Sequence, residues 1–310
     1  MPTQIGLQIG ARLGSALVVM FGVCTLVFLL LHLVPGDPVE AMLGESARPA
    51  DREALRHALG LDLPIAEQYG RYLIGLSRLD LGHSFQDQRP VVDLLAERLP
   101  ATLQLTVAAL MLALALAIPL GVLAAHRRGS ALDGGAMAFS LIGISMPNFW
   151  LGPLLILVFS LWLGWTPVSG SDRPLSLVLP VITLGTALAA VLARMVRASV
   201  LEVLGEDYVR TARAKGLSEI AVLRRHALRN AWLPVLTLLG LQLGGLLGGA
   251  VITETVFAWP GVGSLLVESI QARDFPVVQG CVLLISLVYV LVNTLTDLAY
   301  VWVDPRIGRG

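Results

Sequence analysis

The chain has 310 residues, of which 55% are hydrophobic and only 14% are charged. This composition is far more apolar than that of a soluble domain and indicates an integral membrane protein. The charges balance to a net charge of zero, so the overall charge predicts no binding to nucleic acid or to acidic substrates.

A helix needs about 20 apolar residues to cross the hydrocarbon core of a bilayer. Six segments reach that length without an Asp, Glu, Lys or Arg: Leu13–Val34, Ala101–Ala125, Gly134–Leu163, Leu175–Ala193, Trp232–Thr253 and Phe275–Thr296. The third is longer than one crossing requires and contains Pro147 and Pro153, so we expect it to be tilted or kinked. The sequence therefore predicts an all-α membrane protein with six transmembrane helices.

The stretch between the first two spans, residues 35–100, is expected to fold into short helices. It begins with the turn-forming run Val34–Pro38, and Asp51 is expected to cap a short helix. Apolar residues from Ile65 onward follow helical spacing, and a second amphipathic turn is predicted from Pro90. The segment is either a helical cover on the membrane surface or a docking platform for a soluble partner, and the pattern favours neither.

Positive residues predict the orientation, since short cytoplasmic loops carry an excess of Lys and Arg. With the N-terminus inside, the inside segments hold thirteen such residues, whereas the short outside loops hold only Arg173 and Arg273. Both termini are therefore expected in the cytoplasm. The predicted order is a first transmembrane helix, 1–34, an extracytoplasmic helical insertion, 35–100, a transmembrane core, 101–303, and a cytoplasmic tail, 304–310.

The core contains a polar cytoplasmic segment, residues 199–231, between the fourth and fifth spans. Residues 199–215 are expected to form a helix that stops at Gly216, because glycine tolerates the left-handed conformation of a helix cap. Ser218 is expected to cap a second short helix, with Glu219 opposing the positive end of its dipole. The sequence thus predicts a basic hairpin of two helices that meet at a glycine.

Two roles fit this basic hairpin. Its arginines suit a surface that contacts anionic lipid headgroups. The small residues Thr211, Ala212 and Ala214 near the bend instead suit the close approach of another protein. The pattern leaves both roles open and favours docking of a partner.

The hairpin resembles the cytoplasmic coupling segment, the EAA loop, of the membrane subunits of ATP-binding cassette (ABC) importers. When aligned on Gly216, only Ala212, Gly216 and Leu228 match the general pattern. The strings YVRTARAKGL (208–217) and HALRN (226–230) nevertheless look like those of the dipeptide, oligopeptide and nickel permease branch. Further strings similar to that branch follow in order: LHLVPGDPV (31–39), LGLDLPIAEQYGRYL (59–73), LDLGHSF (79–85), ERLPATLQL (97–105), SMPNFWLG (145–152), ETVFAWPGVG (254–263) and DPRIG (304–308).

This resemblance implies a permease subunit of type I ABC importer architecture in the bacterial cytoplasmic membrane. It implies a pore shared with a second homologous permease subunit, two ATPase subunits or domains that bind ATP and Mg²⁺, and an extracytoplasmic substrate-binding protein that delivers peptides. The chain itself is expected to bind no cofactor and no metal. The residues implied at the ATPase contact are Tyr208, Arg210, Thr211, Ala212, Arg213, Gly216 and Leu217.

Local motifs agree with a subunit that is not an enzyme. A phosphate-binding loop needs a lysine directly after a glycine, but the only lysine, Lys215, follows Ala214. The sequence contains neither a His-Glu-x-x-His zinc helix nor a Gly-x-Ser-x-Gly nucleophile elbow. Cys24 and Cys281 lie in apolar stretches without neighbouring ligand residues, so neither a disulfide framework nor a metal site is expected.

Candidate pathway residues lie in the spans. Three glycines recur every four residues from Gly240, and this spacing either packs helices closely or lines a subunit interface or pathway. An acid near the end of a span, such as Glu254, is costly unless it is paired or hydrated, so it either gates the pathway or has a structural role at the membrane surface. The pathway or gate candidates are Asn148, Trp150, Gly244, Gly248 and Glu254.

The sequence supports an importer of di- or oligopeptides. The same machinery would serve for nickel, glutathione or another small solute, because the coupling segments do not encode the cargo. A secondary transporter driven by an ion gradient is a further alternative, for which paired acids or broken helices at mid-membrane in symmetric halves are expected.

Overall fold

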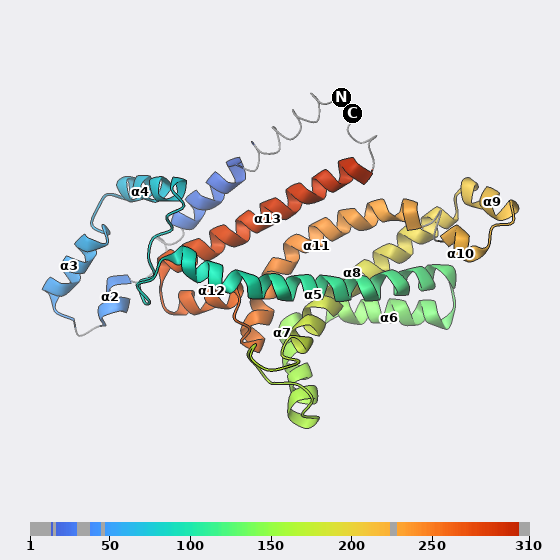
Figure 1. Ribbon diagram of the computed structural model, residues 1–310, viewed down its shortest axis with the longest axis horizontal. Helices are drawn as coiled ribbons and strands as arrows, with labels where there is room; N and C mark the ends of the chain where they lie inside the picture. The colour runs from blue at the N-terminus through green and yellow to red at the C-terminus, as the bar shows by residue number, and fades with distance from the viewer. Residues whose placement is uncertain (1–13, 15–16, 30–37, 45–46, 224–227, 304–310) are drawn as a thin grey trace. The chain divides into compact units, whose positions relative to one another are not determined.

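The computed structural model describes residues 14, 17–29, 38–44, 47–223 and 228–303. The regular elements in these ranges are helices (Figure 1). They divide between two compact units: Met1–Thr102 with Pro260–Val290, and Leu103–Trp259 with Leu291–Gly310. The predicted turn at Val34–Pro38 and the predicted cytoplasmic tail, 304–310, fall wholly or mostly outside the described residues.

Among the described residues, three helices are long and apolar enough to cross a membrane: α5 (Val91–His126), α8 (Val178–Leu204) and the Phe275–Thr296 part of α13 (Phe275–Val303). Two bent pairs pass the same test if each pair is one span. They are α6 (Ala131–Ser145) with the stretch 148–162, and the two halves of α11 (Leu228–Phe257). In the first predicted span, the described apolar helix is Leu17–Leu29. The protein is thus helical with several apolar helices, and the count of six spans stays a prediction.

The third predicted span is sharply bent. α6 ends at Ser145, and Met146 is extended, with φ −93° and ψ 112°. This follows from Pro147, because the residue before a proline avoids the helical conformation. α7 (Asn148–Leu155) then runs into a π-helix, η1 (Ile156–Trp162), and the 148–162 stretch lies at 104° to α6. The expected kink is therefore present at Pro147, and it divides the segment into two half-helices.

α8 is more enclosed than α5. In its most apolar stretch 56% is buried, against 28% for α5, and it packs against α6, α7 and α11. A Cβ added to Gly143 of α6 would lie 2.5 Å from the Cβ of Ala190, and one added to Gly121 of α5 would lie 2.7 Å from the carbonyl oxygen of Ala193. Glycines therefore bring α5 and α6 close to α8.

The first unit has its own core where the start of α5 meets α12 (Val262–Gln271) and the start of α13. Its buried members are Val91, Leu94, Leu95, Val262, Leu265, Val277 and Cys281. The amphipathic turn predicted from Pro90 is thus the beginning of α5, which continues without a break into the second predicted span. The expected amphipathic turn is confirmed, since Leu95 is buried while Val92 is exposed.

Three short helices precede this core: α2 (Pro38–Leu43), α3 (Pro49–Ala58) and α4 (Ile65–Ser77). The N-cap of α3 is Arg48 and not Asp51, which lies in the first turn and accepts a 3.1 Å hydrogen bond from Arg48 Nε. α4 packs on the helix Leu17–Leu29, where the Tyr69 hydroxyl lies 2.6 Å from Thr25 Oγ1. The expected helices from Ile65 are confirmed.

The loop before α5 is tied to the residue that precedes α13. The carboxylate of Asp274 accepts hydrogen bonds from the backbone N–H groups of Phe85 (3.1 Å) and Gln86 (3.3 Å), and from the Ser84 hydroxyl. Asp274 is only 3% exposed, and a buried carboxylate is tolerated because these donors replace water. Ser84 of the LDLGHSF string therefore positions a loop.

Candidate functional site

The cytoplasmic hairpin, residues 199–231, consists of the end of α8 and two short helices, α9 (Asp207–Ala214) and α10 (Glu219–Val222). Figure 1 shows both short helices beyond the C-terminal end of α8. α8 stops at Leu204, and Glu206 is extended, with ψ 148°, before α9 begins. The prediction of one helix over residues 199–215 is therefore wrong, since the chain turns at Gly205 and Glu206.

Gly216 forms the predicted left-handed turn, with φ +82°. The N–H of Gly216 donates to the carbonyl of Arg213 at 2.9 Å, and the N–H of Leu217 donates to the carbonyl of Ala212 at 3.4 Å. These two bonds across a left-handed glycine are the Schellman motif that ends many helices. The Ser218 hydroxyl then accepts the N–H of Ala221 at 3.4 Å, which confirms Ser218 as the cap of α10.

An ion pair closes the hairpin across this turn. Arg213 at the end of α9 reaches Glu219 at the start of α10, with Nε 2.8 Å from Oε1 and a second contact of 3.2 Å. The hydrogen bonds from Arg213 lower the pKa of the Glu219 carboxyl below its ordinary value. Both side chains remain partly exposed, so the pair sets geometry more than stability.

The predicted ATPase-contact residues separate into a surface set and one core residue. Ala212 is 5% exposed and packs with Val209 and Val222, so it fills the interior of the hairpin instead of its surface. The other predicted residues are exposed: Tyr208, Arg210, Thr211, Arg213, Gly216 and Leu217. Arg224 and Arg225, two further arginines of the basic hairpin, lie outside the described part.

The hairpin is fixed firmly to the helices on either side. Leu223, just after α10, belongs to a buried cluster with Val200 of α8, and with Ala231 and Val235 of α11. The Tyr208 hydroxyl of α9 accepts a 2.6 Å hydrogen bond from the side-chain amide of Asn230. A displacement of α9 and α10 would therefore be passed to α8 and α11.

A second tie, not predicted from the sequence, joins α8 to α6 near this end. Two nitrogens of Arg197 contact the carboxylate of Asp133, with Nη2 2.8 Å from Oδ2. The same oxygen accepts the N–H of Gly129 at 2.9 Å. The residue types gave no pattern for this pair, because 64 residues separate its members.

The second unit also contains a cavity of about 360 Å³ among the apolar helices. Its lining comes from the turn between α6 and α7, from α8 and from the middle of α11, and comprises Gly143, Ile144, Met146, Pro147, Asn148, Leu184, Ala187, Leu188, Val191, Gln242, Gly245, Leu246 and Gly249. The lining is apolar except for the two amides of Asn148 and Gln242. This is the usual make-up of a small-molecule site.

The predicted pathway candidates meet this cavity only in part. Asn148 lines it, whereas Trp150, Gly244, Gly248 and Glu254 are not in its lining. Trp150 is 52% exposed, and Glu254 has no exposed surface. Gln242 was missed, because a single glutamine in an apolar run has no pattern of its own.

The glycine repeat of α11 also divides. A Cβ on Gly240 would lie 2.1 Å from a methyl carbon of Thr296 in α13, which confirms close packing there. A Cβ on Gly248 would meet nothing within 4 Å, so Gly248 serves no close contact between helices. Gly240 therefore packs closely against α13, and Gly248 makes no such contact in the described part of the chain.

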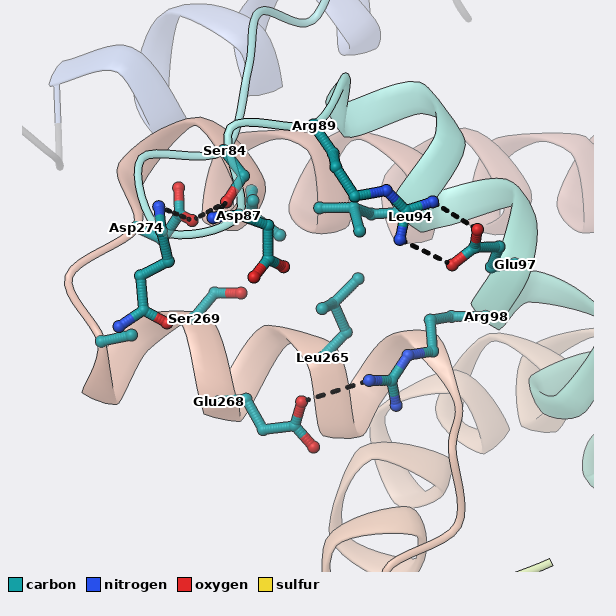
Figure 2. A pocket seen from close by; sticks show the side chains of 13 residues that line it. Ser84, Asp87, Arg89, Leu94, Glu97, Arg98, Leu265, Glu268, Ser269 and Asp274 are labelled. Carbon is teal, nitrogen blue, oxygen red and sulfur yellow. Dashed lines mark hydrogen bonds and ion pairs between the residues drawn. The ribbon is translucent and has the colours of Figure 1, made fainter.

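The first unit carries a smaller, charged pocket of about 190 Å³ (Figure 2). Two ion pairs line it, one between Arg89 and Glu97 and one between Arg98 and Glu268, which are 3.5 Å apart. Figure 2 shows the Asp87 carboxylate directed into the pocket beside the loop that Asp274 holds. Charged side chains of both signs thus line the pocket, from the loop before α5, from α5 and from α12.

Known proteins match almost the whole chain. The family model described as "Binding-protein-dependent transport system inner membrane component" matches residues 117–309, and the model of the corresponding N-terminal part matches residues 8–106. The chain is 46% identical to the di/tripeptide transport system permease protein DppB of Pseudomonas aeruginosa, over 96% of this chain and 98% of the relative. It is also 46% identical to the glutathione transport system permease protein GsiC of Escherichia coli, over 96% and 97%.

Solved structures agree on the fold. The MetNI methionine ABC transporter in an inward-facing conformation matches with a TM-score of 0.56 and 21% identity, over 68% of this chain and 96% of that chain. Two bent helix pairs are present, at 104° and 46°, but a bend alone does not distinguish an ABC importer from an ion-gradient transporter, for which breaks at mid-membrane in symmetric halves were expected. The family matches do separate them: the chain belongs to the binding-protein-dependent transport system inner membrane components.

Proposed function

We propose that the chain is a permease subunit that imports di- and oligopeptides into the bacterial cytoplasm, driven by ATP hydrolysis in other subunits. The observation that carries the proposal is the 46% identity to a di/tripeptide permease over nearly the full length of both proteins. The equal identity to a glutathione permease supports glutathione, itself a modified tripeptide, as the second candidate cargo.

The hairpin is the proposed receiver of force. Its exposed residues include Tyr208, Arg210 and Thr211 on α9, and its turn is fixed by Gly216. An ATPase subunit that holds this surface would pull on α8 and α11 through the buried cluster around Leu223. A rigid hairpin is needed, because a slack one would absorb the displacement.

The partners follow from this arrangement. Two ATPase subunits or domains would bind ATP and Mg²⁺, and a second permease subunit would complete the pore. We propose six spans with both termini inside, which places the charged pocket around Asp87 and Arg98 outside. Its mixed charges, held by two helices and by the loop that Asp274 fixes, support docking of a substrate-binding protein there.

Reconstitution of the complex with its ATPases, partner permease and binding protein tests the proposal. The ATPase subunits and ATP are enclosed in the vesicles, and the binding protein and labelled dialanine are added outside. We expect more uptake of dialanine with ATP than with a non-hydrolysable ATP analogue. Glutathione and Ni²⁺ are the comparison solutes. ATP-dependent uptake of Ni²⁺ without uptake of either peptide would refute the peptide assignment.

A further inference from the structure

The cavity in the second unit combines features that bear on the chemistry of the cargo. About 360 Å³ falls within the roughly 300–1,000 Å³ range of small-molecule sites. Its lining has no charged residue and two carboxamides, Asn148 and Gln242, on different helices. Neither side-chain amide is hydrogen-bonded to another residue in the part of the chain that the structure describes.

The backbone around the cavity is irregular. The break at Met146 and Pro147 contributes to the lining, and α11 bends by 46° between its halves Asn230–Leu246 and Gly248–Phe257, beside Gly245 and Leu246. Irregular backbone among apolar helices is tolerated where it lines a cavity or is buried in protein. Substrate sites of transporters are found at such discontinuous helices.

We propose that this cavity binds the main-chain peptide group of a passing peptide through the amides of Asn148 and Gln242. Peptides of different sequence share a C=O acceptor and an N–H donor in each peptide unit. A carboxamide supplies both a donor and an acceptor, so the pair matches the part of the cargo that does not vary.

The rest of the lining explains why side chains would not be selected. Leu184, Leu188 and Val191 offer apolar contact without fixed polar partners, and Gly245 and Gly249 leave room. Uncharged amides also release the cargo more readily than a desolvated ion pair would. The inference rests on the proposed function and adds which atoms of the peptide are recognised within the membrane.

The test compares a dipeptide with its ester analogue in the reconstituted complex. The probes are L-alanyl-L-alanine and the depsipeptide in which an ester oxygen replaces the peptide N–H, each at a saturating level. Because the same binding protein loads both the native complex and the variants, its own preference cancels when their uptake ratios are compared.

We expect the dipeptide-to-ester uptake ratio to fall by about 2- to 10-fold in the Asn148→Leu/Gln242→Leu variant, the range for one neutral hydrogen bond. Leu241→Ala is the control, since Leu241 is 67% exposed, neighbours Gln242 and is not in the lining. An unchanged ratio in the double variant, with dialanine uptake by the native complex intact, overturns this inference alone. A native complex that moves no dipeptide overturns both the inference and the proposed function.

A second variant decides the question if the double variant does not assemble. Gly245→Leu places a side chain in the cavity where a Cβ meets nothing within 4 Å, so the helix can still pack. Uptake of diphenylalanine is expected to fall at least about 5-fold more than uptake of diglycine, because a filled cavity excludes the larger cargo first. Gly135→Leu, at another open and exposed position on α6, is expected to change neither. Equal loss for both peptides in Gly245→Leu contradicts the cavity as a cargo site.

Discussion

Arg213 and Glu219 face each other across the turn at Gly216, with Nε 2.8 Å from Oε1. The pair joins the last turn of α9 to the first residue of α10. Together with the two backbone bonds of the Gly216 turn, it gives the hairpin one defined shape. The coupling proposal depends on that shape, since the exposed residues of α9 are useful only on a rigid support.

The Arg213–Glu219 pair predicts a pH dependence. The pKa of Glu219 is lower in the folded hairpin than its ordinary value of 4.5, so the pair stabilises the hairpin fully above that pH and the stabilisation is lost as the pH falls through the lowered pKa. Hydrogen exchange across residues 207–222, corrected for the intrinsic rate, should stay constant from about pH 7 to 5 and rise below about pH 4.

Glu219→Gln removes the charge and keeps the size of the side chain. Its exchange at neutral pH should be faster than that of the native chain and should show no rise from this group at low pH. Asp207→Asn is the control, because the Asp207 side chain is 95% exposed beside Arg210. Identical exchange in Glu219→Gln and the native protein at every pH would show that the pair has no part in the hairpin.

Loss of the Asp274 carboxylate is expected to unfold the loop before α5 while the core of the first unit stays folded. Asp274→Ala deprives the N–H groups of Phe85 and Gln86 and the Ser84 hydroxyl of a buried acceptor. We expect a loss of about 2–4 kcal/mol, since hydrogen bonds to a charged group contribute about 1.5–3 kcal/mol each and water replaces part of them. Residues 82–91 should then become the first site of proteolysis, whereas Asp87→Ala, at a residue whose carboxylate points into the pocket, should not change the pattern.

A side chain at Gly143 is expected to destabilise the packing of α6 against α8. A Cβ there would lie 2.5 Å from the Cβ of Ala190, so Gly143→Val must push α6 away from α8. Overpacking of this kind costs about 1–3 kcal/mol or more, and the thermal unfolding temperature in detergent should fall. Gly135→Val, at an open position of the same helix, serves as the control, and an equal fall in both variants would mean that the helix interior and not the contact is at fault.

The predicted orientation is open to chemical labelling. Cys24 and Cys281 are buried, so the native chain should react little with a membrane-impermeant maleimide. With both termini inside, Arg173→Cys should be labelled in intact cells and Lys215→Cys only after the membrane is permeabilised. The reverse order would invert the topology and remove the proposed coupling role of the hairpin.

Local chemistry explains which parts of the fold were predictable from the sequence. The left-handed Gly216 and the cap at Ser218 were predicted because each depends on a residue type and its immediate neighbours. The early end of α8 was not predicted. Gly205 has φ −80°, an ordinary helical value that any residue adopts, so the glycine at this position gives no signal for the end of a helix. Pro147 did signal a disruption, but its size, 104°, depends on packing between α6, α7 and α8.

Contacts between distant segments were beyond prediction. Ser84 and Asp274 are 190 residues apart, and neither residue type indicates a partner. Gly143 and Ala190 meet because two helices cross there, which one sequence cannot specify. The cavity was missed for the same reason: Asn148 was a candidate, but Gln242 becomes relevant only once α11 lies beside the turn between α6 and α7.

Gly216 offers the most direct test of force transfer through the hairpin. Its φ of +82° is strained for other residues, while the space around it is open, so a substitution acts on the backbone and not by a clash. Valine should cost about 1–2 kcal/mol or more in this conformation, whereas asparagine tolerates it. The measurement is ATP-dependent dialanine uptake by the reconstituted complex, together with the amount of ATPase subunit that co-purifies. We predict that Gly216→Val loses both and that Gly216→Asn keeps both; full uptake and full ATPase association in Gly216→Val would contradict the account.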